Sequence, residues 1–278
     1  MKKPLLTASL AAAAAVLSAA CIMVMDPEQT TSWQPRGEFR RTVEVAAGGT
    51  LALENGFGNV EVTGWEKDSV EVAAQGAAAL PGEKRKVRAY GFWEIKPDVE
   101  IKQTDGGLTI RTRPFDGLGD PPSVDYRIRV PNSISLSGIR VGKGNLTVSD
   151  VFGRLEASID KGDLAVSNFS GSVDASLGTG NVDVEVLDIR DDDTITISSR
   201  EGDIVLRLER GVGARVEVEA PRGEVRSDFD LGAKTPAPSV SGRIGSGGAT
   251  VTLKAADGSI EIRAVKEGPG DAREKNGR

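Results

Sequence analysis

The chain has no histidine and only one cysteine among its 278 residues. Without histidine it lacks the commonest general base and the commonest zinc ligand. For the same reason, its serines have no histidine to activate them as nucleophiles. One cysteine can form no disulfide within the chain. We therefore predict no catalytic residue, no metal site and no cofactor.

Aromatic residues are also scarce, at 4% of the chain, whereas glycine occurs 34 times. This composition is typical of a folded chain with many tight turns and a core of small aliphatic side chains. It favours strands joined by glycine turns over a helical bundle. Acidic residues (41) outnumber basic ones (35), which gives a net charge of −6. Because nucleic acids are bound by clustered Lys and Arg, this balance argues against a nucleic-acid partner.

The first 20 residues contain, in order, the three regions of an export signal. Lys2 and Lys3 precede an alanine-rich apolar run over residues 5–16, and the small residues 18–20 come directly before Cys21. This order predicts a signal peptide at residues 1–20. A membrane-spanning helix is the alternative, but it needs about 20 predominantly apolar residues, and this run is poor in strongly hydrophobic ones.

The motif LSAAC, which ends at Cys21, resembles the bacterial lipobox, although Ser18 stands at the third position before the cysteine. The resemblance implies that Cys21 carries a diacylglyceryl group and anchors the chain to a membrane, since two or three acyl chains make a stable anchor. Ile22 is not the aspartate of inner-membrane retention, which favours the outer membrane of the bacterial envelope. The alternative is an unmodified cysteine after an ordinary signal peptide. We predict a flexible tether over residues 21–39.

An internal repeat built around a glycine occupies the second half of the chain. Its units are KGNLTV (143–148), KGDLAV (161–166), TGNVDV (179–184), EGDIVL (201–206) and RGEVRS (222–227). The glycines of these units lie 18, 18, 22 and 21 residues apart, at Gly144, Gly162, Gly180, Gly202 and Gly223. A second alternating segment lies between successive units, so each repeat consists of two short strands separated by turns.

Within the repeats apolar and polar residues alternate, as at Leu146 and Val148. A period of two predicts half-buried strands and excludes a helix. The recurring glycine suits a turn that other residues resist, and the Asn or Asp after it can bond backbone amides. If each repeat is one coil, equivalent residues stack about 4.8 Å apart. One expected ladder is Asn145, Asp163, Asn181 and Asp203.

The predicted fold is all-β: a single-chain β-solenoid, similar to a β-helix, with about 18–22 residues per coil. The β domain is expected at residues 40–264, with a less regular β region before the repeats and a disordered tail at 265–278. A basic run at 84–88 lies beside Tyr90, Phe92 and Trp93. We interpret it as a cap over the open end of the solenoid, with contact to lipid or glycan as the alternative.

Acidic residues are the strongest candidates for chemistry. A polysaccharide lyase or glycosidase needs converging carboxylates, which Asp160, Asp163, Asp174 and Asp183 could supply. They also fall at outward or turn positions of the repeat, and we interpret them as surface residues. The aspartates at 191–193 lack the alternate spacing and turn glycine of a calcium loop and predict a solvated turn.

Four segments together resemble the bacterial putative-adhesin family of β-strand-repeat domains of unknown function. They are ENGFGNVEVTGWEKDSVEV from residue 54, YRIRVP from 126, the serial units GNLTV, GDLAV, GNVDV and GDIVL, and GRIGSGGATVTLKAADGSIEI from 242. The resemblance spans about residues 40–264. It implies a β-solenoid-like domain, often exported or membrane-tethered, without established catalytic residues.

We therefore expect a non-catalytic lipoprotein of the bacterial cell envelope. It would present a solenoid surface for adhesion, binding or scaffolding, with an envelope protein or a glycan as partner besides the membrane. A polysaccharide-active β-helix enzyme of the lyase or glycosidase type is the alternative.

Overall fold

The computed structural model describes residues 38–265, apart from 47, 80–91, 105, 115–120 and 233, and without the side chains of 78, 79 and 92–95. Outside these residues lie the predicted signal peptide, Cys21, most of the tether, the basic run, and the predicted tail except Val265, whose N–H donates to the carbonyl of Leu208. All regular elements in the described part are β-strands, and it contains no helix. Accordingly, no helix there is long and apolar enough to cross a membrane.

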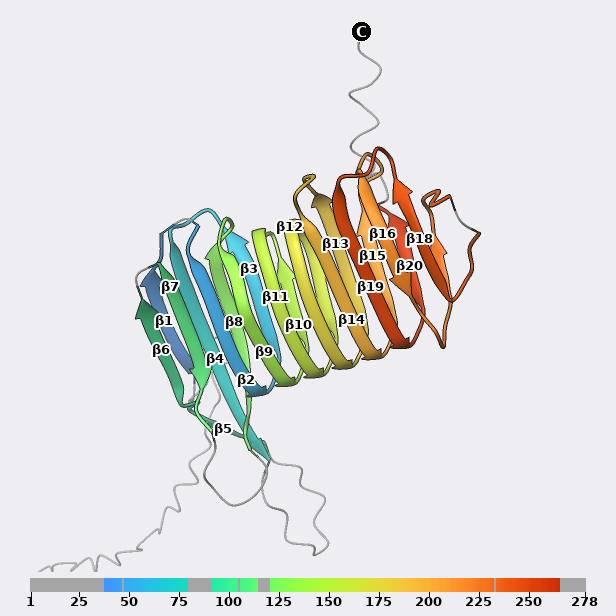
Figure 1. Cartoon of the computed structure of the whole chain (residues 1–278). Coiled ribbons are helices and arrows are strands. Elements are labelled where there is room, and N and C mark those ends of the chain that lie inside the picture. The colour runs from blue at the N-terminus through green and yellow to red at the C-terminus, as the bar shows by residue number, and fades with distance from the viewer. Residues whose placement is uncertain are drawn as a thin grey trace, which may run out of the picture. The chain divides into compact units, whose positions relative to one another are not determined.

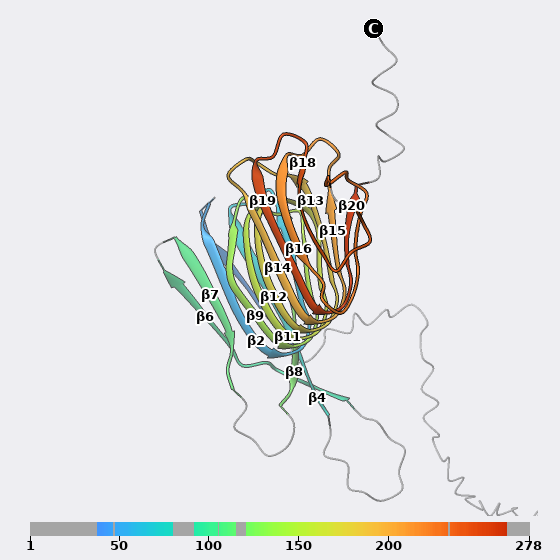
Figure 2. The ribbon, with the colours of Figure 1, turned by 45° about the vertical axis from the view of Figure 1, so that its right-hand side comes forward.

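The strands form two layers, which Figures 1 and 2 show from two sides as rows of neighbouring strands. Layer one consists, in spatial order, of β6 (Val99–Thr104), β7 (Gly107–Thr112), β2 (Thr50–Phe57), β9 (Ser135–Lys143), β11 (Phe152–Lys161), the second half of β12 (Leu164–Thr179), β14 (Thr194–Glu201), β19 (Ala249–Asp257), β16 (Ala214–Glu219) and β18 (Ser239–Ile244).

Layer two is built in the same way. It consists of β1 (Glu38–Glu44), β4 (Ser69–Ala79), β8 (Ser123–Pro131), β3 (Val60–Trp65), β10 (Leu146–Ser149), the first half of β12, β13 (Val182–Asp188), β15 (Ile204–Leu208), β20 (Ile260–Ala264) and β17 (Val225–Ser227). β5 (Phe92–Ile95) pairs with β4. The first strand, β1, begins at Glu38, two residues before residue 40, where the β domain is predicted to start.

The repeat forms the coils that the glycine spacing predicts. Each central coil contributes one strand to each layer, and its strands pair in parallel with those of the next coil. Leu146 lies beside Leu164, and Leu164 beside Val182. Val182 in turn lies beside Ile204. These register steps equal the first three glycine spacings, 18, 18 and 22 residues, and the prediction of an all-β solenoid is confirmed.

The alternation of the sequence becomes the division between core and surface. Inward positions are almost all Val, Leu, Ile and Ala, and Tyr126 and Phe169 are the largest side chains that are fully buried. Among the described residues only Asn55 and Ser199 are buried polar side chains. Burying aliphatic side chains stabilises a fold by about 25 cal/mol per Å² of apolar surface. The core is enclosed between two layers of strands. Many inward positions along the solenoid must therefore carry aliphatic side chains in register to stabilise it.

Two ladders run along the turn edge of the solenoid. Gly162 has φ +142°, and its N–H donates to the carbonyl of Thr179 at 2.9 Å. A Cβ at Gly162 would lie 2.0 Å from the carbonyl oxygen of Gly144, so the coils can approach this closely only at glycine. The second ladder is made by side-chain oxygens that accept the N–H of the next coil, through Asn145, Asp163, Asn181 and Asp203 at 2.8–3.1 Å.

The order of the coils in space departs from their order in the chain at both ends. The last coil, β19–β20, lies between β14–β15 and β16–β17. Gly223 therefore approaches Gly258, and Gly258 approaches Gly202. At the other end, β2–β3 lies between β7–β8 and β9–β10. Each strand of an interleaved coil is paired on both sides, so its backbone N–H and C=O groups are not left unpaired at a sheet edge.

Candidate functional site

The residues that the sequence singled out lie apart from one another. Gly144, Gly162, Gly180, Gly202 and Gly223 lie along the turn edge, where each meets the backbone of a neighbouring coil. Cys21, predicted to carry the lipid, is outside the described residues.

The four candidate acids do not converge. Asp160 on β11 and Asp174 on β12 point outward from layer one. Asp163 belongs to the turn ladder. Asp183 on β13, in layer two, forms an ion pair with Arg207. Asp174 and Asp183 therefore lie on opposite layers, so these two carboxylates cannot act on the same bond.

The aspartates at 191–193 form a turn, as predicted. Asp193 accepts hydrogen bonds from the hydroxyl of Ser172 at 2.8 Å and from the N–H of Arg190 at 2.8 Å. Its carboxylate therefore closes the turn and ties it to β12. Among the described residues, no group of three His, Cys, Asp or Glu side chains is placed to hold a metal ion.

A row of charged side chains crosses the outer surface of layer one near its N-terminal end. Parallel pairing of β2 with β7 and β9 places Glu54 directly between Arg111 and Arg140. Antiparallel pairing of β6 with β7 adds Glu100 beside Arg111. Beyond Arg140 the same row continues as the serines Ser158, Ser176 and Ser198. Beyond Ser198 the row becomes charged again at Lys254 on β19 and Glu219 on β16, which form an ion pair at 3.2 Å. The arrangement of one carboxylate between two arginines belongs to the first four strands of the row.

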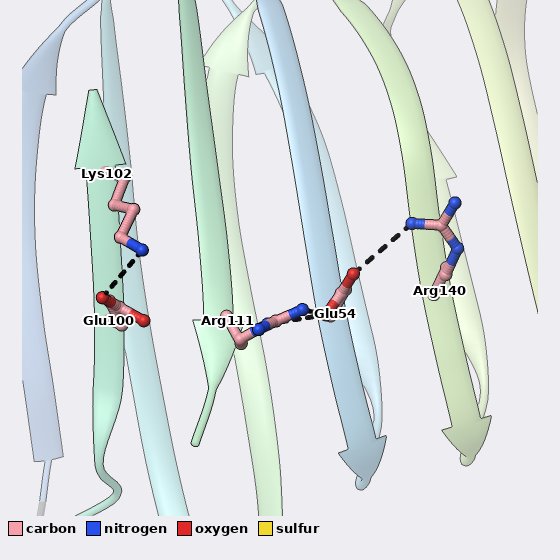
Figure 3. A network of polar contacts seen from close by, with 5 residues as sticks. All are labelled: Glu54, Glu100, Lys102, Arg111 and Arg140. Atoms are coloured by element: carbon pink, nitrogen blue, oxygen red, sulfur yellow. Dashed lines mark hydrogen bonds and ion pairs between the residues drawn. The ribbon is translucent and has the colours of Figure 1, made fainter. Parts of the chain in front are cut away.

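Glu54 is shared by two guanidinium groups, as Figure 3 shows. Its Oε2 accepts a hydrogen bond from Nε of Arg111 at 2.7 Å, and Nη2 of the same arginine lies at 2.5 Å. Its Oε1 lies 3.5 Å from Nη1 of Arg140. The side chains of Arg111 and Arg140 are 53% and 63% exposed. One carboxylate therefore orients two arginines that remain open to solvent.

These three residues line a hollow of about 720 Å³. Its polar lining also contains Arg113, Ser158 and Asp160. Its apolar lining is formed by Phe57, Pro114, Pro121, Pro122 and Val141. Phe57 is 40% exposed, so part of its side chain is open to solvent. The hollow thus combines an apolar wall with three arginines.

Two glycines lie beside the apolar wall of the hollow. Gly142 on β9 and Gly56 on β2 both line the hollow. A Cβ at Gly142 would lie 2.5 Å from the carbonyl oxygen of Gly56, so the two strands approach closely at this point. A larger residue at 142 would force the strands apart and would also fill part of the hollow.

A buried polar network lies next to the hollow and joins three strands. The amide nitrogen of Asn55 donates to the carbonyls of Gly58 and Val124 at 3.1 and 2.9 Å. Its amide oxygen accepts from the hydroxyl of Thr112 at 3.0 Å, which leaves that hydroxyl oxygen to accept from Tyr126 at 2.7 Å. Burial raises the pKa of Tyr126 to about 12. The network fixes the ends of β2 and β7, from which Glu54 and Arg111 project.

No residue of the row was predicted from the sequence. Arg111 and Arg140 are 57 and 86 residues from Glu54. The only local signal is that each is a charged residue at an outward position of an alternating strand. Such positions are common, so this signal could not have selected these three.

Comparison with known proteins supports the description of the fold. Residues 128–263 match the family model Toastrack DUF4097, and the architecture is a toastrack-type β fold. No curated protein matches the chain.

Two similar solved structures come from bacteria. A "putative cell adhesion protein" from Clostridium sporogenes is 17% identical with a TM-score of 0.46, over 82% of this chain and 99% of that one. A "putative adhesin" from Bacteroides fragilis is 14% identical with a TM-score of 0.29, over 83% of this chain and 98% of that one.

Proposed function

We propose that this protein is a non-catalytic lipoprotein of the bacterial cell envelope that presents a rigid β-solenoid for adhesion, binding or scaffolding. Cys21, lipidated after removal of residues 1–20, would anchor it, with the outer membrane favoured over the inner. The partner would be an envelope protein or a glycan.

The observation that carries the proposal is the construction of the solenoid surface. Each coil is held to the next by backbone pairing in both layers and by the side-chain ladder along the turn edge. Outward side chains such as Ser158, Ser176 and Ser198 therefore stand in straight rows at the strand spacing of about 4.8 Å. Because pairing and the ladder already hold these side chains in place, the protein would lose little conformational entropy on binding an extended partner.

The anchor is tested by metabolic labelling with an alkyne fatty acid in bacteria that express the full chain or its Cys21→Ser variant. We expect label on the wild type only, and release of the variant from the membrane fraction. Label that persists in the variant would overturn the anchoring.

The binding role is tested with the purified full chain on arrays of envelope and host glycans and by pull-down of envelope proteins. Retention of a defined glycan or envelope protein would support the proposal. If neither class is retained, the binding role is wrong.

A further inference from the structure

We propose that the hollow beside Glu54 binds an acidic oligosaccharide, by holding a carboxylate on the two arginines and a sugar ring against Phe57. This inference deepens the proposed function, on which it rests, by assigning the surface and the chemical class of its ligand.

The first argument is the local charge. The hollow is lined by Arg111, Arg113 and Arg140 against Glu54 and Asp160, which leaves one net positive charge. The chain as a whole carries −6. A positive site on an acidic protein concentrates an anion locally and repels it elsewhere, which gives selectivity as well as affinity.

The second argument is the geometry of the arginines. Glu54 engages Nε and Nη2 of Arg111 but only Nη1 of Arg140. Each guanidinium has five N–H donors, so both retain donors beyond those given to Glu54. Arginine forks match a carboxylate in a bidentate manner, and Glu54 holds both forks in place before a ligand arrives.

The third argument is the apolar wall. Phe57 and the prolines Pro114, Pro121 and Pro122 line the same space as the arginines. Small-molecule sites typically combine an apolar lining with a few oriented polar groups. The carbon-bound hydrogens on one face of a pyranose ring offer an apolar surface to such a wall, whereas a bare phosphate has none. The wall therefore favours a sugar acid over a simple anion.

The fourth argument is the continuation of the site along layer one. A smaller hollow of about 130 Å³ shares Arg140 and Ser158 with the first and is lined further by Glu156, Asp174 and Ser176. Ser158, Ser176 and the carboxylates of Glu156 and Asp174 can bond sugar hydroxyls. Because these two carboxylates repel an anion, a sugar acid in this second hollow would be held by its hydroxyls, with its carboxylate turned to solvent. The two hollows thus form a path across β9, β11 and β12, which suits an oligosaccharide better than a single sugar.

The test is isothermal titration of the full chain with tetragalacturonate, with its methyl ester as the uncharged match and with inorganic phosphate. We expect tetragalacturonate to bind, and both other probes to bind at least about tenfold more weakly, because charge-assisted hydrogen bonds and ring contacts are each lost. Equal binding of phosphate would show a simple anion site, and no binding of tetragalacturonate would remove the proposal.

Variants locate the site. Arg140→Gln and Phe57→Ala should each weaken tetragalacturonate binding about tenfold or more. Arg200→Gln is the matched control, because Arg200 is a 68% exposed arginine on β14 of the same layer, outside the hollow. Its affinity should stay within about twofold of the wild type. Because Arg140 and Phe57 are exposed, all three variants should keep the wild-type unfolding midpoint, so a lost affinity reports on binding.

The outcomes separate this inference from the proposed function. All variants keep Cys21, so lipid labelling and retention of an envelope partner are measured independently. If both persist while Arg140→Gln binds tetragalacturonate as the wild type does, only the assignment of the hollow is wrong. If tetragalacturonate binds at the hollow but Cys21→Ser keeps its label, only the anchoring is wrong.

Discussion

Replacing Gly162 by alanine should destabilise the solenoid strongly, although the change adds a single methyl group. The backbone φ of +142° is one that L side chains rarely adopt. The new Cβ would lie 2.0 Å from the carbonyl oxygen of Gly144 and 2.6 Å from its carbon. Real Cβ contacts do not fall below 3.0 Å, so the two coils must separate by about 1 Å at this edge.

The cost has two parts. A non-glycine residue in so sparsely populated a backbone conformation costs about 1–3 kcal/mol. Separation of the coils weakens the hydrogen bonds from the N–H of Gly144 to the carbonyl of Lys161 and from the N–H of Asp163 to Asn145, both 2.9 Å long. These are worth about 1 kcal/mol each. Together the expected loss is about 3–5 kcal/mol, a large share of the roughly 5–15 kcal/mol that stabilises a typical domain.

The assay is urea and thermal unfolding followed by far-UV circular dichroism. At about 2–4 °C per kcal/mol for a domain of this size, Tm should fall by roughly 6–20 °C. Gly211→Ala is the control, because Gly211 has no atom within 4 Å of its Cβ position and no left-handed φ. It should change stability by less than about 1 kcal/mol. If Gly162→Ala has the same urea midpoint and the same Tm as the wild type, the inferred clash between the two coils is wrong.

Three further substitutions test the polar contacts. Tyr126→Phe should cost about 1 kcal/mol near neutral pH. Because the folded pKa of about 12 exceeds the usual 10.0, wild-type stability should fall as pH rises from about 10 to 12, and the variant should lack this component in pH-dependent unfolding. Asn55→Leu should cost about 2–4 kcal/mol in urea unfolding, since it removes the hydrogen bonds to the buried carbonyl of Val124 and the part-buried carbonyl of Gly58. Asn145→Ala removes one exposed acceptor from the ladder and should cost at most about 1 kcal/mol; a larger loss would mean that the ladder acts cooperatively.

Much of the solenoid could be predicted because its signals are local. The alternation in segments such as 143–148 specifies which side of each strand is buried, and the glycine spacing specifies the coil length. The Asn and Asp residues after the glycines were expected to form a ladder, and hydrogen bonds between successive coils do link them. In each case the interacting residue lies one repeat away in the chain, so the repeat length gives its sequence separation.

The order of the coils at both ends could not be obtained in the same way. Gly223 follows Gly202 in the chain, but the coil that contains Gly258 lies between them in space. Any coil with a glycine turn and alternating aliphatic residues can pair with any other, because the edges are chemically alike. Which coils become neighbours at the ends depends on which arrangement pairs the remaining free strand edges. That is a property of the whole molecule and not of one repeat.

The sequence by itself therefore determined the strand pattern, the coil length and the turn chemistry, since these arise from residues close to one another in the chain. Only the tertiary structure decided the order of the end coils and the meeting of Glu54 with Arg111 and Arg140 across 57 and 86 residues. Pairing of β2 with both β7 and β9 creates that charged row. The register between distant strands is set by packing of their buried faces, whereas the outward side chains, which form the candidate site, are placed only as its consequence.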